Sequence, residues 1–195
     1  MNLKHKLFIF FMMTKIKKLR SLERKNAILE IKNIDSYGKF CGYASVFNVK
    51  DSYNDIVMPL AFKKTLQNKN IKQDIKLLWQ HSQDKPIGYF EVIKEDPIGL
   101  YVEGKIMLDI QQGMEAYNLI KAKSVSGLSI GYMVKSVDYD KKDNTRLLKE
   151  IDLFEISIVT FPANEYSNIT YCKSMSVEES IIKKLDMLEN FLRKC

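Results

Sequence analysis

The chain has 195 residues, of which 46% are hydrophobic and 28% charged, a balance typical of one globular domain with a sizeable core. Three widely separated cysteines exclude a disulfide framework and a CxxC zinc site, and they favour a reducing compartment. The net charge of +7 arises entirely from residues 1–25, so residues 26–195 sum to zero and have no basic surplus for nucleic acid.

A basic extension precedes the domain at residues 1–27 and contains one short apolar run, LFIFFMM at 7–13. Seven apolar residues are too few to cross a bilayer, and the basic run that follows has no small-residue cleavage site of a signal peptide. We therefore predict an N-terminal extension outside the fold and no membrane association. A simpler explanation than a signal peptide is that translation begins at Met12 or Met13, so that part of this arm is not translated.

Apolar patterns predict the elements of the first half of the domain, which we expect to span residues 28–172. Strand-like patterns, a polar loop and a helix with proline near its start follow one another. In chain order these are a strand at 27–34, a DSYG turn at 35–38, a strand at 39–47, a loop at 48–55, a helix at 58–68 and a buried strand at 74–82 that ends at His81.

The second half continues with longer strands. The expected elements are strands at 86–96 and 99–107 joined by a turn at 95–99, a helix at 111–123, a strand at 127–140, a turn at 141–144 and one or two strands at 145–161. Strands dominate and only two helices interrupt them. We therefore predict an α+β fold, a strand-rich compact β-barrel-like domain with a few helices.

An amphipathic helix is predicted at residues 176–195, within a C-terminal tail at 173–195. Ser176 and Glu179 have the spacing of a capping box, and an apolar seam with spacings of 4, 3 and 4 follows them. This seam would pack on its own domain or against a second copy of the chain, and both alternatives stay open.

Ser129 lies between two glycines in the stretch SVSGLSIGYM at 124–133. A serine needs a general base to become a nucleophile, and His81 is the only histidine outside the N-terminal extension. Small neighbours would leave room for a substrate backbone, whereas a bend in the strand is the alternative explanation of the glycines. For His81 the alternative is a half-buried side chain bonded to a backbone carbonyl. A lone histidine provides no metal site, and we predict no metal and no cofactor.

Glu155 places a carboxylate inside the apolar stretch DLFEISIVTF at 152–161. Strict alternation would put it on one strand face with Leu153, Ser157 and Val159. Because an unpaired buried carboxylate is costly, we expect a histidine ring as the partner of Glu155. The alternatives are a salt bridge to a lysine and exposure on an edge strand.

Five stretches match, in the same order, those of the prohead serine proteases of tailed bacteriophages, which are related in fold to the herpesvirus assemblins. They are GYASVFNVKDSYNDIVMPLAF, LLWQHSQDKPIGYF, GLYVEGKI, SGLSIGYMV and EIDLFEISIVTFPAN, and the chain resembles this family from about residue 38 to 170. The resemblance implies a serine endopeptidase with an assemblin-like fold and His81 and Ser129 as its catalytic pair. It implies Glu155 as the third member, at a position that is histidine in the herpesvirus enzymes. One departure is Leu60, where the family usually has glycine, and this leaves the shape of that loop open.

The resemblance also implies partners and a location. The substrates would be the major capsid protein with its scaffold segment and the protease itself, with the portal and a second copy of the chain as further partners. Cleavage would take place inside the assembling procapsid, in the cytoplasm of the host bacterium. Two other functions stay open: an inactive capsid-assembly or scaffold component with the same fold, and a nucleic-acid-binding module that uses the basic arm.

Overall fold

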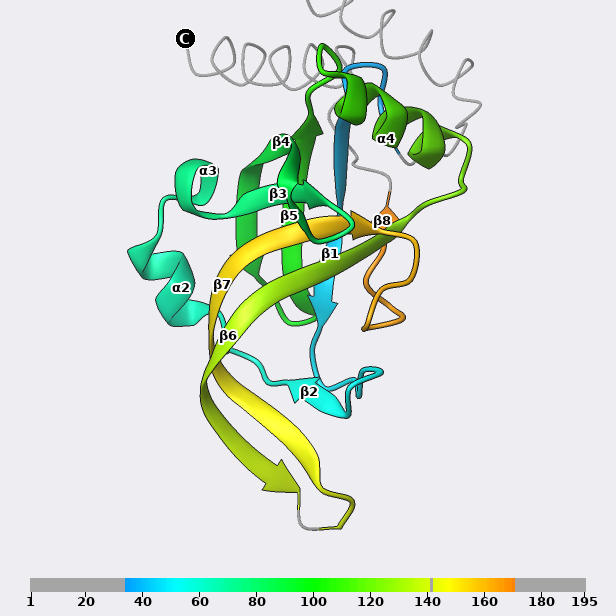
Figure 1. Ribbon diagram of the computed structural model, residues 1–195. Helices are drawn as coiled ribbons and strands as arrows, with labels where there is room; N and C mark the ends of the chain where they lie inside the picture. The colour runs from blue at the N-terminus through cyan, green and yellow to red at the C-terminus, as the bar shows by residue number, and fades with distance from the viewer. Residues whose placement is uncertain (1–33, 141, 171–195) are drawn as a thin grey trace, which may run out of the picture. The chain divides into compact units, whose positions relative to one another are not determined.

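The computed structural model describes residues 34–140 and 142–170 (Figure 1). Eight strands and three helices lie in this part of the chain. In order they are β1 (Lys39–Val46), β2 (Asp55–Val57), α2 (Lys63–Asn68), α3 (Ile71–Asp74), β3 (Lys76–Trp79), β4 (Ser82–Glu95), β5 (Gly99–Ile106), α4 (Gln111–Lys121), β6 (Gly127–Asp140), β7 (Thr145–Val159) and β8 (Ile169–Thr170). The predicted strand at 27–34, apart from its last residue, and the predicted helix at 176–195 lie outside the described residues, as do both terminal extensions.

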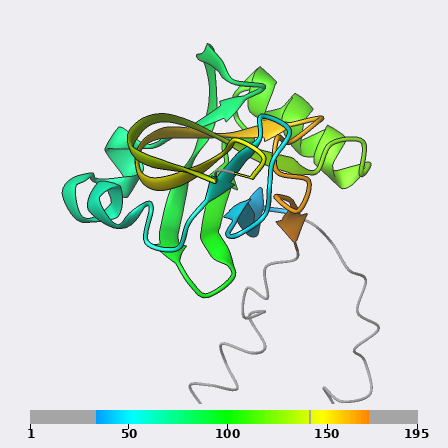
Figure 2. The same ribbon diagram turned by 90° about the horizontal axis from the view of Figure 1, so that it is seen from below.

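All eight strands belong to one sheet. Its path is β2-β7-β3-β4-β5-β1-β8, and β6 pairs with β7 along its length. Most neighbours are antiparallel, but β2 and β3 run parallel to β7. The sheet curls on itself when viewed from below (Figure 2), and an isolated bridge between Gly127 and Asn168 joins the start of β6 to the segment before β8. The predicted α+β class, with a strand-rich, barrel-like domain and few helices, is confirmed.

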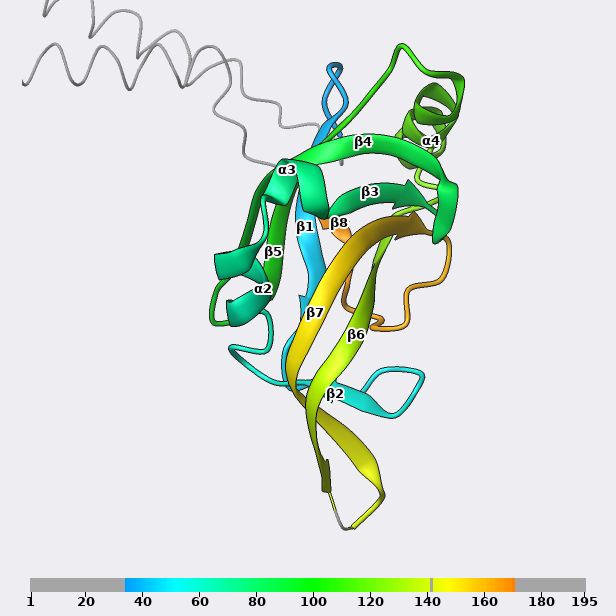
Figure 3. The same cartoon turned by 60° about the vertical axis from the view of Figure 1, so that its left-hand side comes forward.

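Strand β4 links the two sides of this curled sheet. Its first part pairs with β3 and its second part pairs with β5, so the strand arches across the domain (Figure 3). One cluster of apolar side chains forms the core, and its largest fully buried members include Phe40, Phe62, Phe90, Leu77, Leu100 and Leu128. Burying each such side chain contributes about 1.5–3 kcal/mol relative to exposure, so this core stabilises the fold.

The β6–β7 hairpin is the longest feature and extends well beyond the other strands (Figure 1). A register shift sets Gly131 opposite Glu155 and Tyr132 opposite Leu153, which leaves Phe154 as an extra residue in β7. Phe154 is therefore exposed, while Leu153 and residues 156–159 are buried. The prediction of strict alternation through this stretch was wrong, because a β-bulge changes the phase of the strand.

Several predicted boundaries also needed correction. The helix expected over 58–68 begins only at Lys63, because Leu60 has a φ of 71°, in the left-handed region that favours glycine. The strand expected over 74–82 is limited to β3, and His81 lies in the turn after it. Three short elements, α3, β2 and β8, were not predicted, since two to four residues carry no readable periodicity. The strand at 127–140 has the predicted bounds.

An ion pair between a buried aspartate and a half-exposed arginine joins β2 to the β6–β7 hairpin. The Asp55 side chain is 1% exposed and accepts a hydrogen bond from Arg146 Nε at 2.6 Å and another from the Arg146 Nη2 group. The hydroxyl of Tyr132 donates to the same carboxylate at 3.2 Å. Because Asp55 belongs to β2, these bonds secure the loop that precedes β2 against the hairpin.

Replacing Arg146 with alanine should lower the free energy of unfolding by roughly 3 kcal/mol, since the Asp55 carboxylate stays buried without its cation. The matched control is Lys149→Ala, which removes an exposed pair with Asp138 on the same hairpin and should cost less than about 1 kcal/mol. Urea unfolding of both variants measures the difference. Equal, small effects would contradict a structural role for the Asp55–Arg146 pair.

Candidate active site

A two-residue turn between β3 and β4 presents His81. Trp79 pairs with Ser82 across this turn, and the two residues between them have left-handed φ values, 52° for Gln80 and 59° for His81. Such turns usually contain Asn or Gly, so the local sequence does not favour this one. Its stability comes from β7 and the residue after it. The Gln80 side chain donates to Thr160 Oγ1 at 2.8 Å, and the Gln80 amide donates to the carbonyl of Ile158 at 3.0 Å.

The His81 ring is hydrogen-bonded to Glu155, with 2.7 Å between Nδ1 and Oε1. The Glu155 side chain is 12% exposed and that of His81 is 45% exposed. The prediction that Glu155 needs a partner is confirmed, and the partner is the histidine. The hydrogen bond to Glu155 raises the pKa of His81 above its usual value; burial opposes this rise and the charge of Glu155 adds to it. With Nδ1 engaged by a carboxylate, Nε2 is the nitrogen free to accept a proton.

Ser129 reaches the same region through the register of the β6–β7 hairpin. Ser129 lies opposite Ser157, and Gly131 lies opposite Glu155. Directly opposed residues of an antiparallel pair share one face, so Ser129 lies on the face that carries Glu155. Ser129 and His81 also line one cleft of about 270 Å³. Among the described residues, no hydrogen bond joins the Ser129 hydroxyl to the His81 ring. The two are brought together by the shared cleft and the strand register.

The two glycines that flank this serine have a structural reason. A Cβ atom at Gly131 would lie 2.1 Å from Glu155 Oε1, and one at Gly127 would lie 2.7 Å from the carbonyl oxygen of Val159. The interpretation that these glycines leave open space for a substrate was therefore wrong, because protein atoms fill that space. The alternative of an irregular strand agrees with the register shift directly after Gly131. Because Gly131 has no side chain, the Glu155 carboxylate can lie over β6 at this position.

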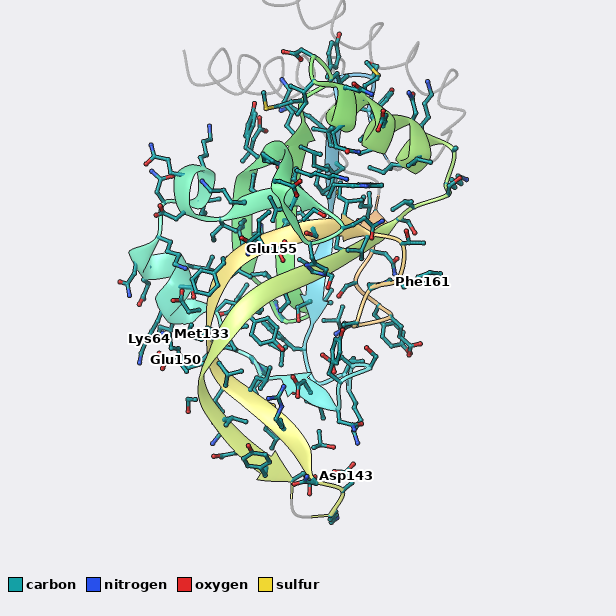
Figure 4. The ribbon with its side chains drawn as sticks, viewed as in Figure 1. Lys64, Met133, Asp143, Glu150, Glu155 and Phe161 are labelled. Atoms are coloured by element: carbon teal, nitrogen blue, oxygen red, sulfur yellow. The ribbon has the colours of Figure 1, made fainter. Side chains whose placement is uncertain are left out.

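Loops and the strands β1, β2 and β6 both contribute to the walls of the cleft. The segment before β2 supplies Asp51 and Tyr53, and the loop after β7 supplies Phe161. Tyr53 is 74% and Phe161 90% exposed, and Figure 4 shows Phe161 on this loop, away from Glu155. The Asp51 carboxylate accepts hydrogen bonds from the amides of Tyr53 and Asp55, and burial raises its pKa. The cleft thus combines an aromatic rim with a carboxylate. Asp51 and Tyr53 belong to the predicted loop at 48–55, whereas Phe161 was predicted as the end of a strand and lies in the loop after β7.

Two other acids of β7, Glu150 and Asp152, lie close to Glu155 in the sequence. Glu150 forms an ion pair with Lys64 at 2.6 Å, and Asp152 forms one with Lys69 at 2.5 Å. Figure 4 shows Glu150 beside Lys64, at a distance along β7 from Glu155. Both acids are therefore engaged near α2, and Glu155 is the one that contacts His81.

Metal ligands do not cluster in the described part of the chain, where no group of three or more His, Cys, Asp or Glu side chains could hold an ion. Within residues 34–140 and 142–170, no helix has the length and apolar character needed to cross a membrane.

Comparison with known proteins gives several consistent matches. Residues 26–181 match the family model of the caudovirus prohead serine proteases. The prohead protease of Enterobacteria phage HK97 is 37% identical over 158 residues, which cover 80% of this chain and 68% of that protein. The prohead protease of Escherichia phage T5 is 27% identical over 151 residues, covering 75% and 70%.

Two further matches come from a longer protein and from a solved structure. The capsid polyprotein of Pseudomonas phage PAJU2 is 31% identical over 163 residues, which cover 80% of this chain but 23% of the polyprotein. The capsid assembly protease gp21 of bacteriophage T4 has a TM-score of 0.50 at 13% identity, covers 62% of this chain and 81% of its own, and shares the fold. Because the family model matches residues 26–181, most of the chain, this chain belongs to the caudovirus prohead serine proteases.

Proposed function

We propose that Ser129 is the nucleophile of this serine peptidase, that His81 is its general base and that Glu155 orients His81. The observation that carries this assignment is the 2.7 Å bond between His81 Nδ1 and Glu155 Oε1, made beside the cleft that Ser129 lines. A serine, a histidine and an acid from separate segments supply the three roles of a hydrolytic triad.

The geometry supports one course of reaction. His81 Nε2 takes the proton of the Ser129 hydroxyl while Oγ attacks the scissile carbonyl, and the imidazolium then gives this proton to the leaving amine. Water then attacks the acyl group, with His81 taking a proton from the water and returning it to the Ser129 oxygen. Glu155 stabilises the imidazolium through Nδ1–H. Backbone amides beside Ser129 or in the loop after Phe161 would bind the oxyanion.

The substrates we propose are the major capsid protein with its scaffold segment and the protease itself, inside the assembling procapsid of the infected bacterium. The names of the relatives from phages HK97 and T5 support this setting, because both are prohead proteases. A relative named as a capsid polyprotein holds a region similar to this chain, which supports a partnership with capsid protein. The aromatic rim and open cleft suit an extended segment of polypeptide.

Replacing Ser129 with alanine should abolish cleavage of co-expressed capsid protein, read by the mass of that protein. Stability should change by less than about 1 kcal/mol, because only one hydroxyl is lost. A fluorophosphonate probe should label the parent protein and not this variant, whereas Ser126→Ala serves as the control and should keep both label and cleavage. Persistent processing by Ser129→Ala would remove it as the nucleophile, and an unlabelled parent protein would favour an inactive assembly component.

The rate of cleavage should rise with pH as His81 loses its proton, since only the neutral ring can accept a proton from serine. Because Glu155 raises the pKa of His81, the midpoint should lie above the ordinary value of about 6.5. Glu155→Gln removes the charge, so the midpoint should fall and the rate should drop roughly 10-fold to 10⁴-fold. Active-site-titrated kcat/KM across the pH range measures both. A lowered melting temperature with unchanged rate and midpoint would make Glu155 purely structural.

Gly131→Ala should weaken the His81–Glu155 bond, because the new Cβ would lie 2.1 Å from Glu155 Oε1 and would displace the carboxylate. The pKa of His81 should then fall toward its ordinary value, measured by NMR titration in a chain with only two histidines. Gly42→Ala is the matched control, since its Cβ would meet the carbonyl oxygen of Asn168 at 2.2 Å instead. An unshifted His81 in Gly131→Ala would show that the carboxylate does not depend on this glycine.

A further inference from the structure

The hydroxyl of Ser157 contacts both members of the His81–Glu155 pair. It donates to Glu155 Oε2 at 2.6 Å and accepts a hydrogen bond from the backbone amide of His81 at 3.0 Å. The amide can only donate, so the single hydroxyl hydrogen goes to the carboxylate. Ser157 is fully buried in β7, and one side chain thus bridges two residues that approach from different segments.

The first of these bonds fixes the carboxylate. Oε1 of Glu155 holds the ring of His81 and Oε2 holds Ser157, so both oxygens are engaged in different directions. The terminal torsion of a glutamate is otherwise broad and roughly two-fold, and would let the carboxylate turn away from the ring. Ser157 therefore keeps Oε1 aimed at Nδ1.

The second bond fixes the turn. His81 has a left-handed φ of 59°, a conformation that a residue with a side chain seldom adopts unless its surroundings impose it. Its side chain is 45% exposed, so packing restrains it only in part. The bond from the His81 amide to Ser157 anchors the backbone of this residue directly to β7.

We propose that Ser157 is a positioning residue that sets the orientation of His81 toward Ser129 by holding the His81 backbone and the Glu155 carboxylate at once. This role rests on the proposed catalytic functions of His81, Glu155 and Ser129. Ser157 is distinct from the nucleophile, because its hydrogen is committed to Glu155 and its side chain is fully buried, whereas Ser129 lines the cleft.

The test is Ser157→Ala in the full-length protein, assayed on capsid protein that is purified separately and added at known concentrations. We expect kcat to fall roughly 10- to 100-fold through misplacement of the base, with KM nearly unchanged because Ser157 does not reach the substrate. The pKa of His81 should fall toward its ordinary value, and its backbone amide should exchange hydrogen faster. Ser157→Cys retains a weak donor and acceptor, so it should give intermediate values.

Thr65→Val is the matched control. The buried hydroxyl of Thr65 also makes two bonds to β7: it donates to the carbonyl of Ile151 at 2.7 Å and accepts from the amide of Leu153 at 3.2 Å. Removing it should lower stability as Ser157→Ala does, but leave kcat and the pKa of His81 unchanged. Parental kcat and an unshifted His81 in Ser157→Ala would overturn the proposal. The proposal would also be overturned if Ser157→Ala and Thr65→Val lost kcat in the same proportion to their loss of stability.

Fluorophosphonate labelling separates this outcome from failure of the catalytic assignment. Slower labelling of Ser129 in Ser157→Ala supports the positioning role. Cleavage that survives Ser129→Ala would instead refute the catalytic assignment, and with it any role of Ser157 in the reaction, whatever happens to His81 in Ser157→Ala.

Discussion

The hydrogen bond between His81 and Glu155 is the interaction on which the site depends, because it allows a carboxylate to lie within an apolar strand. An unpaired carboxylate there would carry a large desolvation cost, and a histidine relieves it. The surrounding sequence then follows from this pair. Gly131 leaves room for the carboxylate, Ser157 bonds its second oxygen, and the left-handed turn brings the ring to it.

Strand β7 organises these parts because it is paired on both edges. It receives β3, and with it the turn of His81, on one side, while β6 and Ser129 lie on the other. The approach of Ser129 to the pair is therefore a matter of sheet register, and a slip of one residue would turn its side chain to the opposite face. The pairing is regular from Ser129 to Gly131, and the bulge at Phe154 begins only beyond Gly131 along β6. The register at Ser129 is therefore set on the regular side of the bulge.

Sequence patterns could predict what is long and locally determined. Strand β6 has its predicted bounds, and the partner of Glu155 follows from the cost of burying charge. They could not predict what tertiary contacts impose. Gln80 and His81 adopt a turn that their own types disfavour, held by bonds to residues far along the chain. Gly131 was misinterpreted for the same reason, since the atoms beside it belong to a cross-strand neighbour.

A second paired carboxylate, that of Asp55, lines the cleft, and comparing it with Glu155 explains why the two acids have different roles. Asp55 is paired with Arg146, and Glu155 with His81. Asp55 raises the pKa of Arg146, which is protonated in any case, so this pair cannot exchange a proton and only holds the loop of Asp51 and Tyr53 against the hairpin. An imidazole titrates near neutral pH, so the same arrangement around Glu155 can accept and return a proton. The identity of the cation, rather than that of the acid, makes one pair structural and the other suited to catalysis.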